Sequence, residues 1–459
     1  MRLKGRFLVT GFLAAFTMAG QQSQFQGSVA TGTSSPTPLA LTLHEAIDRG
    51  LKANLGLLVS DSANEAARGQ RLRALSTLLP QINAQLGETV EQLNLKTIGF
   101  NLTIPGVSIP VIAGPFHFTD VRAYASWNAF NYNLLKSYRA AEESRRAAQL
   151  SVMDARDLVV QATASAYLQI VADASRVEAI RSQVDTAQAL FDRATDQRRA
   201  GTAAGIDVLR SQVELKQQQQ RLLAQKNQFD KDKLALSRVI GLALGQEFNL
   251  SDTAPFSALN SLTQDEALRM ALAQRPDYQS DQAQVRAAEE AVRAARGERY
   301  PTAGVTADYG DVGPTLASSH GTFSFVASVK VNVFDGKRIS GDVIQAKAAL
   351  KQRRDELADL AGEIDFQVRA AFLDIRTAAE LVAVTQDSLG LASQTLAQAR
   401  DRFAAGVTDN IEVIQAQESV ASANDNLISA LFAHNLAKIG LARALGGTEQ
   451  GIQKFMEVK

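Results

Sequence analysis

The spacing of hydrophobic and polar residues changes its period along the chain. Residues 121–129 and 322–333 alternate between apolar and polar side chains, which predicts strands with one apolar and one polar face. Shorter segments at 82–86 and 303–309 are expected to pair with them. The sequence therefore predicts two β-hairpins.

Elsewhere the apolar residues recur at helical spacing. Residues 132–200 contain neither glycine nor proline, and residues 338–405 contain no proline, so each segment predicts one helix on the order of 100 Å long. Both segments end at a short glycine turn, and returning helices are predicted over about 207–240 and 410–445. Apolar residues in these helices step by three and four or by seven, which indicates helices packed side by side with a left-handed twist.

The same order of elements occurs twice. Pro80 matches Pro301 at an offset of 221 (301 − 80), and Gly241 matches Gly446 at an offset of 205 (446 − 241). A repeat of roughly 200 residues is too long for a solenoid, whose repeats have about 20–50 residues, so we expect two related halves of one structure. The expected divisions are a first repeat, a second repeat and a C-terminal tail, at residues 41–250, 251–447 and 448–459.

Each half opens with a predicted helix start. Thr42 and Thr263 each stand three residues before a glutamate, which is the spacing of a capping box. A short helix is expected after each box. A second helix should then stop before Pro80 or Pro301, because proline disfavours helical geometry in the residue before it.

The first residues have the pattern of a secretory signal. Arg2, Lys4 and Arg6 precede an apolar run that is shorter than the ~20 residues needed to cross a bilayer. We expect a signal peptide at residues 1–20 and a flexible leader at 21–40, with a single-pass anchor as the alternative. No later segment has the ~18 consecutive apolar residues of a transmembrane helix.

Composition excludes several classes of function. The formal net charge is zero, which argues against a nucleic-acid partner because phosphate binding needs a basic face. The chain has no cysteine, so disulfides, thiol catalysis and a lipoprotein anchor are excluded. The histidines are scattered without metal-ligand spacing, and no catalytic or nucleotide-binding motif is present. We therefore predict no catalytic residue, no metal and no cofactor.

The predicted strands point to a membrane. About four strands are too few for a β-sandwich with its own core, which is the soluble alternative. The predicted helices pack against one another, so none is left to cover the apolar face of the strands. If the apolar face meets lipid, every backbone group must be paired and the sheet must close. Known barrels begin at eight strands, so several copies of the chain must share one barrel. Aromatic residues near the strand ends are candidates for a membrane belt, with core packing as the alternative: Trp127, Phe130, Tyr132, Phe323 and Phe334.

This duplicated plan resembles the TolC-like outer membrane factor family. The two turn motifs, RAGTAAGIDVLRSQ at 199–212 and FAAGVTDNIEVIQAQ at 403–417, also match that family. The resemblance covers nearly all of residues 41–447. It implies a mainly α-helical fold with a small β part, in which duplicated long helical hairpins form a trimeric periplasmic α-barrel. Four strands per chain would contribute to a 12-stranded (3 × 4) outer-membrane β-barrel.

The resemblance also implies a function and partners. It predicts a passive exit duct in the outer membrane of a Gram-negative bacterium, built as a homotrimer in contact with outer-membrane lipid. A periplasmic adaptor (membrane fusion) protein would link the duct to an inner-membrane RND or ABC transporter. Efflux of small toxic compounds and type I secretion of proteins would look alike in sequence. The alternative function is a periplasmic coiled-coil adaptor or scaffold with a small β domain.

The family pattern assigns roles to the two turns. Its adaptor-contacting tips correspond to Gly201, Thr202, Gly205, Gly406, Val407 and Thr408. Glu412 takes the first acidic position of the aperture, whereas Gln415 stands at the second. The acidic ring is therefore weaker here, or Asp207 or Asp409 completes it. The alternative for Glu412 is a solvated first-turn carboxylate favoured by the helix dipole.

Overall fold

In the computed structural model, the described residues are 25, 27–97, 99, 110–202, 204–252, 256–257, 262–408 and 410–456. The predicted signal peptide and Asp409 lie outside them. The chain divides into two compact units. One comprises residues 1–64, 148–280 and 358–459, and the other comprises residues 65–147 and 281–357.

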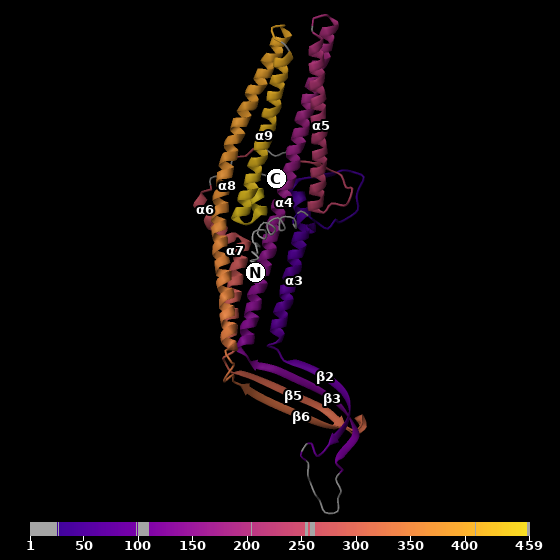
Figure 1. Cartoon of the computed structure of the whole chain (residues 1–459), viewed down its shortest axis with the longest axis vertical. Helices are drawn as coiled ribbons and strands as arrows, with labels where there is room; N and C mark the ends of the chain where they lie inside the picture. Colours follow the sequence, from indigo (N-terminus) through magenta and orange to yellow (C-terminus); the bar gives the residue numbers. More distant parts are fainter. Residues whose placement is uncertain are drawn as a thin grey trace, which may run out of the picture. The chain divides into compact units, whose positions relative to one another are not determined.

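Two long helical hairpins dominate the fold, as the sequence predicts (Figure 1). The first consists of α4 (Tyr132–Arg199) and α5 (Gly205–Ile240), and the second of α8 (Arg338–Ala404) and α9 (Asn410–Leu445). The predicted seven-residue stripe on α9 faces inward: three of its residues are buried and two are half-buried, namely Val413, His434 and Leu441, and Val420 and Leu427. Side-by-side packing of long helices is thereby confirmed.

The helix starts are also confirmed. In α2 (Leu43–Ala53) and α6 (Gln264–Gln274), the preceding threonine and the glutamate three residues later form reciprocal hydrogen bonds. The helices that follow are α3 (Leu55–Ser76) and α7 (Pro276–Gly297). Pro276 occupies the first turn of α7, where its missing N–H costs no hydrogen bond.

Among the described residues, four short elements were not predicted. Strands β1 (Leu39–Leu41) and β4 (Phe248–Leu250) pair in parallel, and a 3₁₀ turn, η1 (Leu316–Ser318), precedes the last strand. The segment assigned to a C-terminal tail begins with helix α10 (Thr448–Met456).

Buried charges hold both ends of α10. The Asp157 carboxylate accepts hydrogen bonds from the backbone N–H groups of Gly447 and Thr448, at 3.1 and 2.9 Å. At the other end, Lys438 Nζ donates to the Phe455 carbonyl at 2.9 Å. The negative charge lies at the N-terminus and the positive charge at the C-terminus, as the helix dipole favours.

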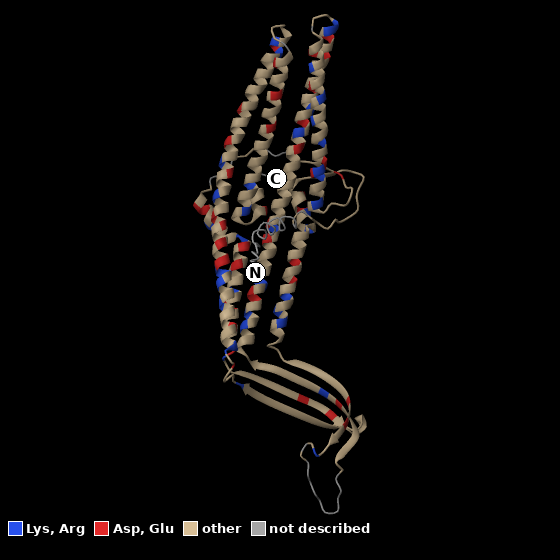
Figure 2. Cartoon of the chain, in the orientation of Figure 1, with Lys and Arg blue, Asp and Glu red and all other residues tan. Residues whose placement is uncertain are grey.

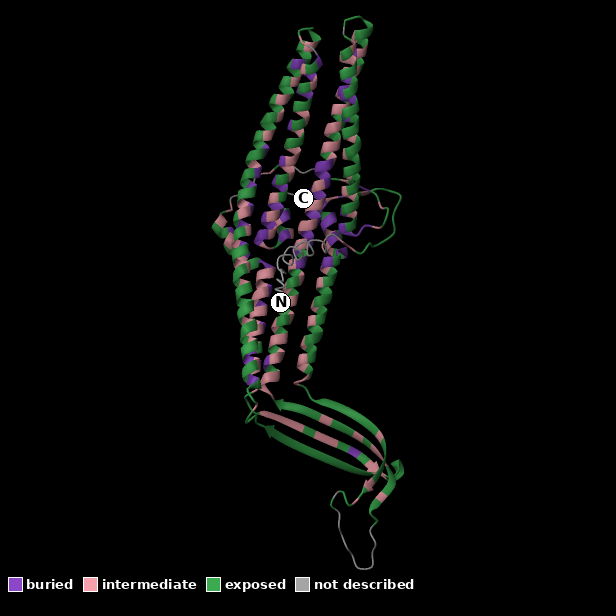
Figure 3. Ribbon diagram, viewed as in Figure 1, coloured by how far each residue is buried: buried purple, intermediate pink, exposed green. Residues whose placement is uncertain are grey.

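The main hydrophobic core lies in the first unit. Buried side chains from α2, α4, α5, α9, β1, β4 and α10 form its largest cluster, which includes Tyr167 and Phe248. A second cluster joins α6, α8 and α9 around Ile364 and Leu441. Figure 3 shows the buried residues gathered along this part of the hairpins. None of the helices in the described part of the chain has the length and hydropathy of a membrane span.

The second unit contains one antiparallel sheet. Its strands are β2 (Gln81–Asn94), β3 (Ile112–Phe130), β5 (Thr302–Gly313) and β6 (His320–Lys330), in the order β2-β3-β5-β6. The two predicted hairpins are thus joined by pairing between β3 and β5. Both β2 and β3 are longer than predicted.

The predicted strand over 322–333 ends early, at Lys330. Lys330 pairs with Thr302, the first residue of β5. Pro301 comes before Thr302 and has no N–H to continue the ladder. Val331, Val333 and Phe334 therefore lie outside the sheet.

Candidate functional site

The free ends of the two hairpins repeat one backbone motif. Gly201 has φ +75° and Gly406 has φ +69°, the left-handed conformation that favours glycine after a helix. The N–H groups of Thr202 and Val407 bond to carbonyls five residues back, at 2.9 and 3.0 Å. This double pattern reverses the chain within a few residues, so the two predicted tips have the same geometry.

The predicted tip residues are mostly exposed. Val407 is 70% exposed, and Gly201, Thr202 and Gly406 are exposed as well. Gly205 begins α5. Thr408 is half-buried, so the exposed part of the predicted tips consists of Gly201, Thr202, Gly406 and Val407.

Glu412 makes contacts within the second hairpin end. Its carboxylate lies 3.4 Å from the Arg402 guanidinium and accepts a hydrogen bond from the Thr408 hydroxyl. Arg402 is in α8, so the ion pair joins the two arms of this hairpin. Glu412 is 40% exposed and lies in the first turn of α9, so its place in an aperture and the alternative of a solvated first-turn carboxylate both stay predictions.

The other predicted aperture residues lie apart from this ion pair. Asp207 in the first turn of α5 pairs with Arg210 at 3.7 Å. Gln415 faces a groove between α5 and α9, with Leu209 and Val213 among the apolar side chains that line it. Asp409 lies outside the described residues.

Asn410 joins the two hairpin ends, and sequence analysis did not single it out. It is 1% exposed, and its Nδ2 donates to Ser211 Oγ in α5 at 2.7 Å. Ser211 in turn donates to the Asp207 carbonyl at 2.8 Å. The repeat offset of 205 aligns Asn410 with Gly205 (410 − 205). A polar side chain therefore replaces a glycine at this position of the second half, and this difference was visible in the sequence.

A small apolar cluster supports this contact. Val413, Ala399 and Ala416 are buried in the second hairpin, and Leu190 of α4 packs against them. The cluster and the Asn410 hydrogen bond together hold the end of the second hairpin against the first.

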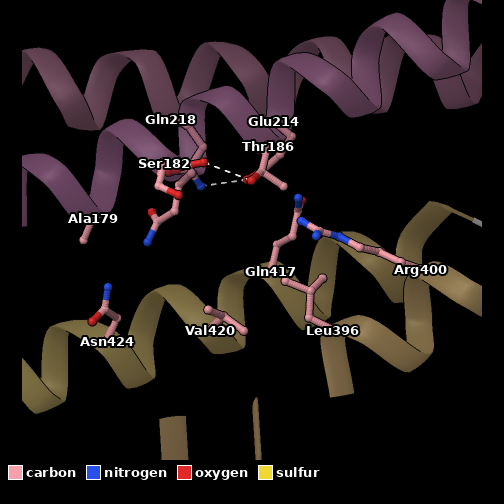
Figure 4. A pocket seen from close by; sticks show the side chains of 11 residues that line it. Ala179, Ser182, Thr186, Glu214, Gln218, Leu396, Arg400, Gln417, Val420 and Asn424 are labelled. Atoms are coloured by element: carbon pink, nitrogen blue, oxygen red, sulfur yellow. Dashed lines mark hydrogen bonds between the residues drawn. The ribbon is translucent and has the colours of Figure 1, made fainter. Parts of the chain in front are cut away.

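Farther from the tips, the hairpins are separated by a cavity of about 270 Å³. Figure 4 shows side chains of α4 and α5 on one side and of α8 and α9 on the other. The buried Glu214 carboxylate accepts a hydrogen bond from Gln218 at 2.7 Å. The Oε1 atoms of Gln218 and Gln417 have no partner. This level of the interface is therefore polar and loosely packed compared with the core.

The predicted membrane belt maps to the sheet and the segment after it. Phe130 and Phe323 are exposed, and Trp127 is exposed while its Nε1 donates to the Leu78 carbonyl at 3.0 Å. Phe323 pairs across the strands with Tyr309, which sequence analysis missed and which is also exposed. Phe334 is exposed beyond the end of β6.

Tyr132 differs from these aromatic residues. It is half-buried, and its ring meets Tyr300 edge to face at 5.2 Å. Its contacts are those of ordinary packing at the start of α4. Among the described residues, no cluster of histidine and acidic side chains is placed to hold a metal.

Comparison with known proteins gives matches along most of the chain. The toluene efflux pump outer membrane protein TtgF of Pseudomonas putida is 24% identical over 424 residues, covering 88% of this chain and 83% of that protein. The pyoverdine export outer membrane protein OpmQ of Pseudomonas aeruginosa is 23% identical over 395 residues, covering 83% and 80%.

Solved structures give the same fold. The Campylobacter jejuni CmeC outer membrane channel superimposes with a TM-score of 0.77 at 15% identity, covering 94% of each chain. The outer-membrane channel OprN has a TM-score of 0.77 at 17% identity, covering 88% of this chain and 90% of its own.

A family model described as outer membrane efflux protein matches residues 46–242 and 267–447. The match follows the two repeats and takes in both hairpins. The protein therefore belongs to the outer membrane efflux protein family, and it is an outer-membrane export channel and not an enzyme.

Proposed function

We propose that three copies of this chain form one channel, which receives cargo from an inner-membrane pump through a periplasmic adaptor and releases it across the outer membrane. The observation that carries the proposal is a four-stranded sheet with two open edges, β2 and β6. Its apolar face is exposed, with Ile82 and Phe323 at 75% and 79%.

Such a sheet needs partners in lipid. Unpaired edge groups are not tolerated in hydrocarbon, and four strands are fewer than the smallest known barrel of eight. Three copies would supply twelve strands (3 × 4), in line with the family resemblance. Each β2 edge would then pair with the β6 edge of a neighbouring copy.

The oligomer is tested on purified protein in detergent. We expect light scattering, corrected for bound detergent, to give the mass of three chains, and we expect electron microscopy to show one elongated particle. A monodisperse monomer or dimer in several mild detergents would contradict the proposal.

We further propose that the Asn410–Ser211 hydrogen bond holds the periplasmic end closed, while the Glu412–Arg402 ion pair keeps the two arms of the second hairpin together. Opening requires the second hairpin end to move away from α5, and the loosely packed cavity between the hairpins supports such a movement. Three Glu412 carboxylates near a narrow opening would also attract cations, because converging charges focus the field.

Conductance in planar bilayers tests the gate. Asn410→Ala should raise the conductance of the resting channel, with Asn426→Ala at an exposed position of α9 as the matched control. Glu412→Ala should weaken block by multivalent cations. Unchanged conductance in Asn410→Ala would remove this residue from the gate, and unchanged block would remove Glu412.

The two tips are proposed to contact the adaptor. Gly406→Trp should leave the trimer intact and abolish complementation of a deletion strain, because a bulky residue with positive φ distorts the turn. Gly201→Trp makes the matched test at the first tip. Loss of the trimer in either variant would mark that turn as structural.

Small molecules are the proposed cargo. The names of TtgF and OpmQ refer to toluene and pyoverdine, which supports small-molecule efflux over protein secretion. A deletion strain, with and without the gene restored, should become hypersensitive to several dyes, solvents or antibiotics. Unchanged sensitivity together with missing secreted proteins would overturn this cargo assignment.

A further inference from the structure

Arg122 forms an unusual contact across three strands of the sheet. From β3 its Nε lies 3.2 Å from Asp120 on the same strand. One terminal nitrogen donates to Asp308 on β5, and the other donates to Thr322 Oγ1 on β6 at 2.7 Å. The side chain is 14% exposed, so the guanidinium lies along the sheet and does not project from it.

Gly310 makes this path possible. It is the direct cross-strand partner of Arg122 on one side and of Thr322 on the other. A Cβ at Gly310 would lie 2.4 Å from the Val121 carbonyl and 2.6 Å from Arg122 Cα. The absent side chain leaves the surface of β5 free for the arginine to cross.

The contact lies on the polar face. Side chains alternate along a strand, so Asp120 and Arg122 share the face opposite Val121. Asp308 is the cross-strand partner of Tyr124 and shares that face as well. Figure 2 shows few charged residues on the strands, with a small group partway along them. Two carboxylates and one guanidinium give this group a formal charge of −1 (1 − 2).

We propose that Arg122 is a positioning residue of the export path: it lies flat across three strands, keeps the passage open, and fixes Asp120 and Asp308 as a net-negative band that favours cations over anions. The inference rests on the proposed function, since it takes the polar face as the inner wall of a shared barrel. Three copies would carry three such groups at one level of that wall.

Charge at that level can be measured with thiol reagents, because the chain has no cysteine of its own. Ser324→Cys places a thiol on the polar face opposite Asp308, and Phe323→Cys places one on the apolar face. Intact cells are treated from outside with a cationic or an anionic water-soluble methanethiosulfonate. The ratio of the two rates at residue 324 then reports the local potential without passage through the periplasmic gate.

Substitutions in the Ser324→Cys background should move this ratio in opposite directions. Arg122→Gln should raise the cation-to-anion ratio by about three- to five-fold, because one unit charge at about 10 Å in water changes the two rates by about two-fold each, in opposite directions. Asp308→Asn should lower the ratio by a similar factor and also slow both reagents, because the freed guanidinium turns into the passage. Asp308→Glu should restore the original ratio, and Lys330→Gln on the same face should have a smaller effect than Arg122→Gln.

The labelling results distinguish failure of the proposed channel from failure of the proposed role of Arg122. Equal labelling of Phe323→Cys and Ser324→Cys would mean that the two faces do not meet lipid and water, which overturns the proposed channel. Preferential labelling at residue 324 with a ratio unmoved by Arg122→Gln and Asp308→Asn would keep the channel and overturn the role of Arg122. If Arg122→Gln only lowers the heat stability of the oligomer, the residue is structural alone.

Discussion

The two halves of the chain keep one backbone and differ in the groups that stabilise it. Asn54 and Arg275 occupy the same repeat position (275 − 221 = 54), and each is almost fully buried after a short helix. Asn54 donates to the Phe25 carbonyl at 2.7 Å and accepts from the Gly56 N–H at 2.9 Å. In the first half, the buried side chain at this position is therefore stabilised by neutral hydrogen bonds, one of them to the N-terminal segment.

In the second half, the buried side chain at this position is Arg275, and an ion pair stabilises it. It forms two hydrogen bonds to Asp277, at 3.1 and 2.6 Å, and one to Gln367 at 2.6 Å. Burial alone would raise the pKa of Asp277, but Arg275 outweighs burial and the pKa lies below its ordinary value. The comparison teaches that the repeat conserves geometry, while the side chains that satisfy it are free to diverge.

Replacing the two residues should give the largest difference between the halves. Arg275→Ala leaves a half-buried carboxylate without its main partner, and it should cost about 3–5 kcal/mol of unfolding free energy. Asn54→Ala removes neutral hydrogen bonds and should cost about 1–3 kcal/mol. Denaturant unfolding of the detergent-solubilised protein, followed by circular dichroism, measures both. Equal losses of unfolding free energy in the two variants would show that the charge of Arg275 adds nothing to the stability of the second half.

Two glycines that follow long helices offer a second contrast. Gly446 follows α9 and lies against Arg275, whereas Gly406 lies in the turn at the end of the second hairpin. Gly446 and Gly406 both have positive φ, but only a Cβ at Gly446 would meet backbone, 2.9 Å from Arg275 Cα. Gly406→Ala should cost about 1–2 kcal/mol through its backbone conformation. Gly446→Ala should cost a further 1–3 kcal/mol, roughly the scale of an overpacked site.

Thermal unfolding of these two glycine variants, scanned side by side, tests the contrast. A lower melting temperature for Gly406→Ala than for Gly446→Ala would contradict the steric argument. Gly201→Ala, which has open space around it like Gly406, serves as the control for a tip.

The smallest expected effect concerns an acidic pair present in one half only. Asp173 in α4 is 2% exposed and contacts Asp232 of α5, whereas the second half has Ala378 and Ala437 at these positions (173 + 205, 232 + 205). Burial raises the pKa of Asp173, and the neighbouring carboxyl of Asp232 raises it further.

A raised pKa means that the folded chain binds this proton more tightly than the unfolded chain. The stabilisation is therefore largest at low pH and is lost as the pH rises from the ordinary carboxyl pKa through the folded value. Asp173→Asn should stabilise the protein slightly at neutral pH and flatten the dependence of stability on pH. Unfolding measured from pH 4 to pH 8 tests this prediction, and Asp387→Asn, at an exposed position of α8, controls for loss of a carboxylate. A steeper dependence in Asp173→Asn would contradict the assignment.

Local sequence signals predicted most of the fold. The capping boxes at Thr42 and Thr263, the seven-residue stripes and the glycine turns each depend on contacts within a few residues, so their patterns are visible in the chain. The family match confirms the export channel and its outer-membrane location, and it does not support the alternative of a periplasmic adaptor.

Long-range contacts could not be predicted. Strands β1 and β4 have three residues each and pair across about 200 positions, too short to give a period. The Asn410–Ser211 bond and the Arg122 group depend on which helices and strands are neighbours and in what register. The end of β6 was mispredicted because alternation continues past Lys330, whereas the missing N–H of Pro301 on the partner strand ends the pairing.

The pairing of β3 with β5 has a consequence for the ring as a whole. It joins the last strand of one half to the first strand of the next, and a β6–β2 seam between copies would do the same. Three chains would then make a quasi-sixfold ring of equivalent hairpins. Ala125 pairs with Ala307. Leu86 pairs with Val121 in the first hairpin and Ala307 pairs with Phe325 in the second. These registers relate Ala307 to Leu86 (307 − 221) and Ala125 to Val329 (125 + 325 − 121), so Val329 should lie opposite Leu86 of the adjacent copy. The β3–β5 pairing within one chain and the β6–β2 pairing between neighbouring chains would thus have the same register.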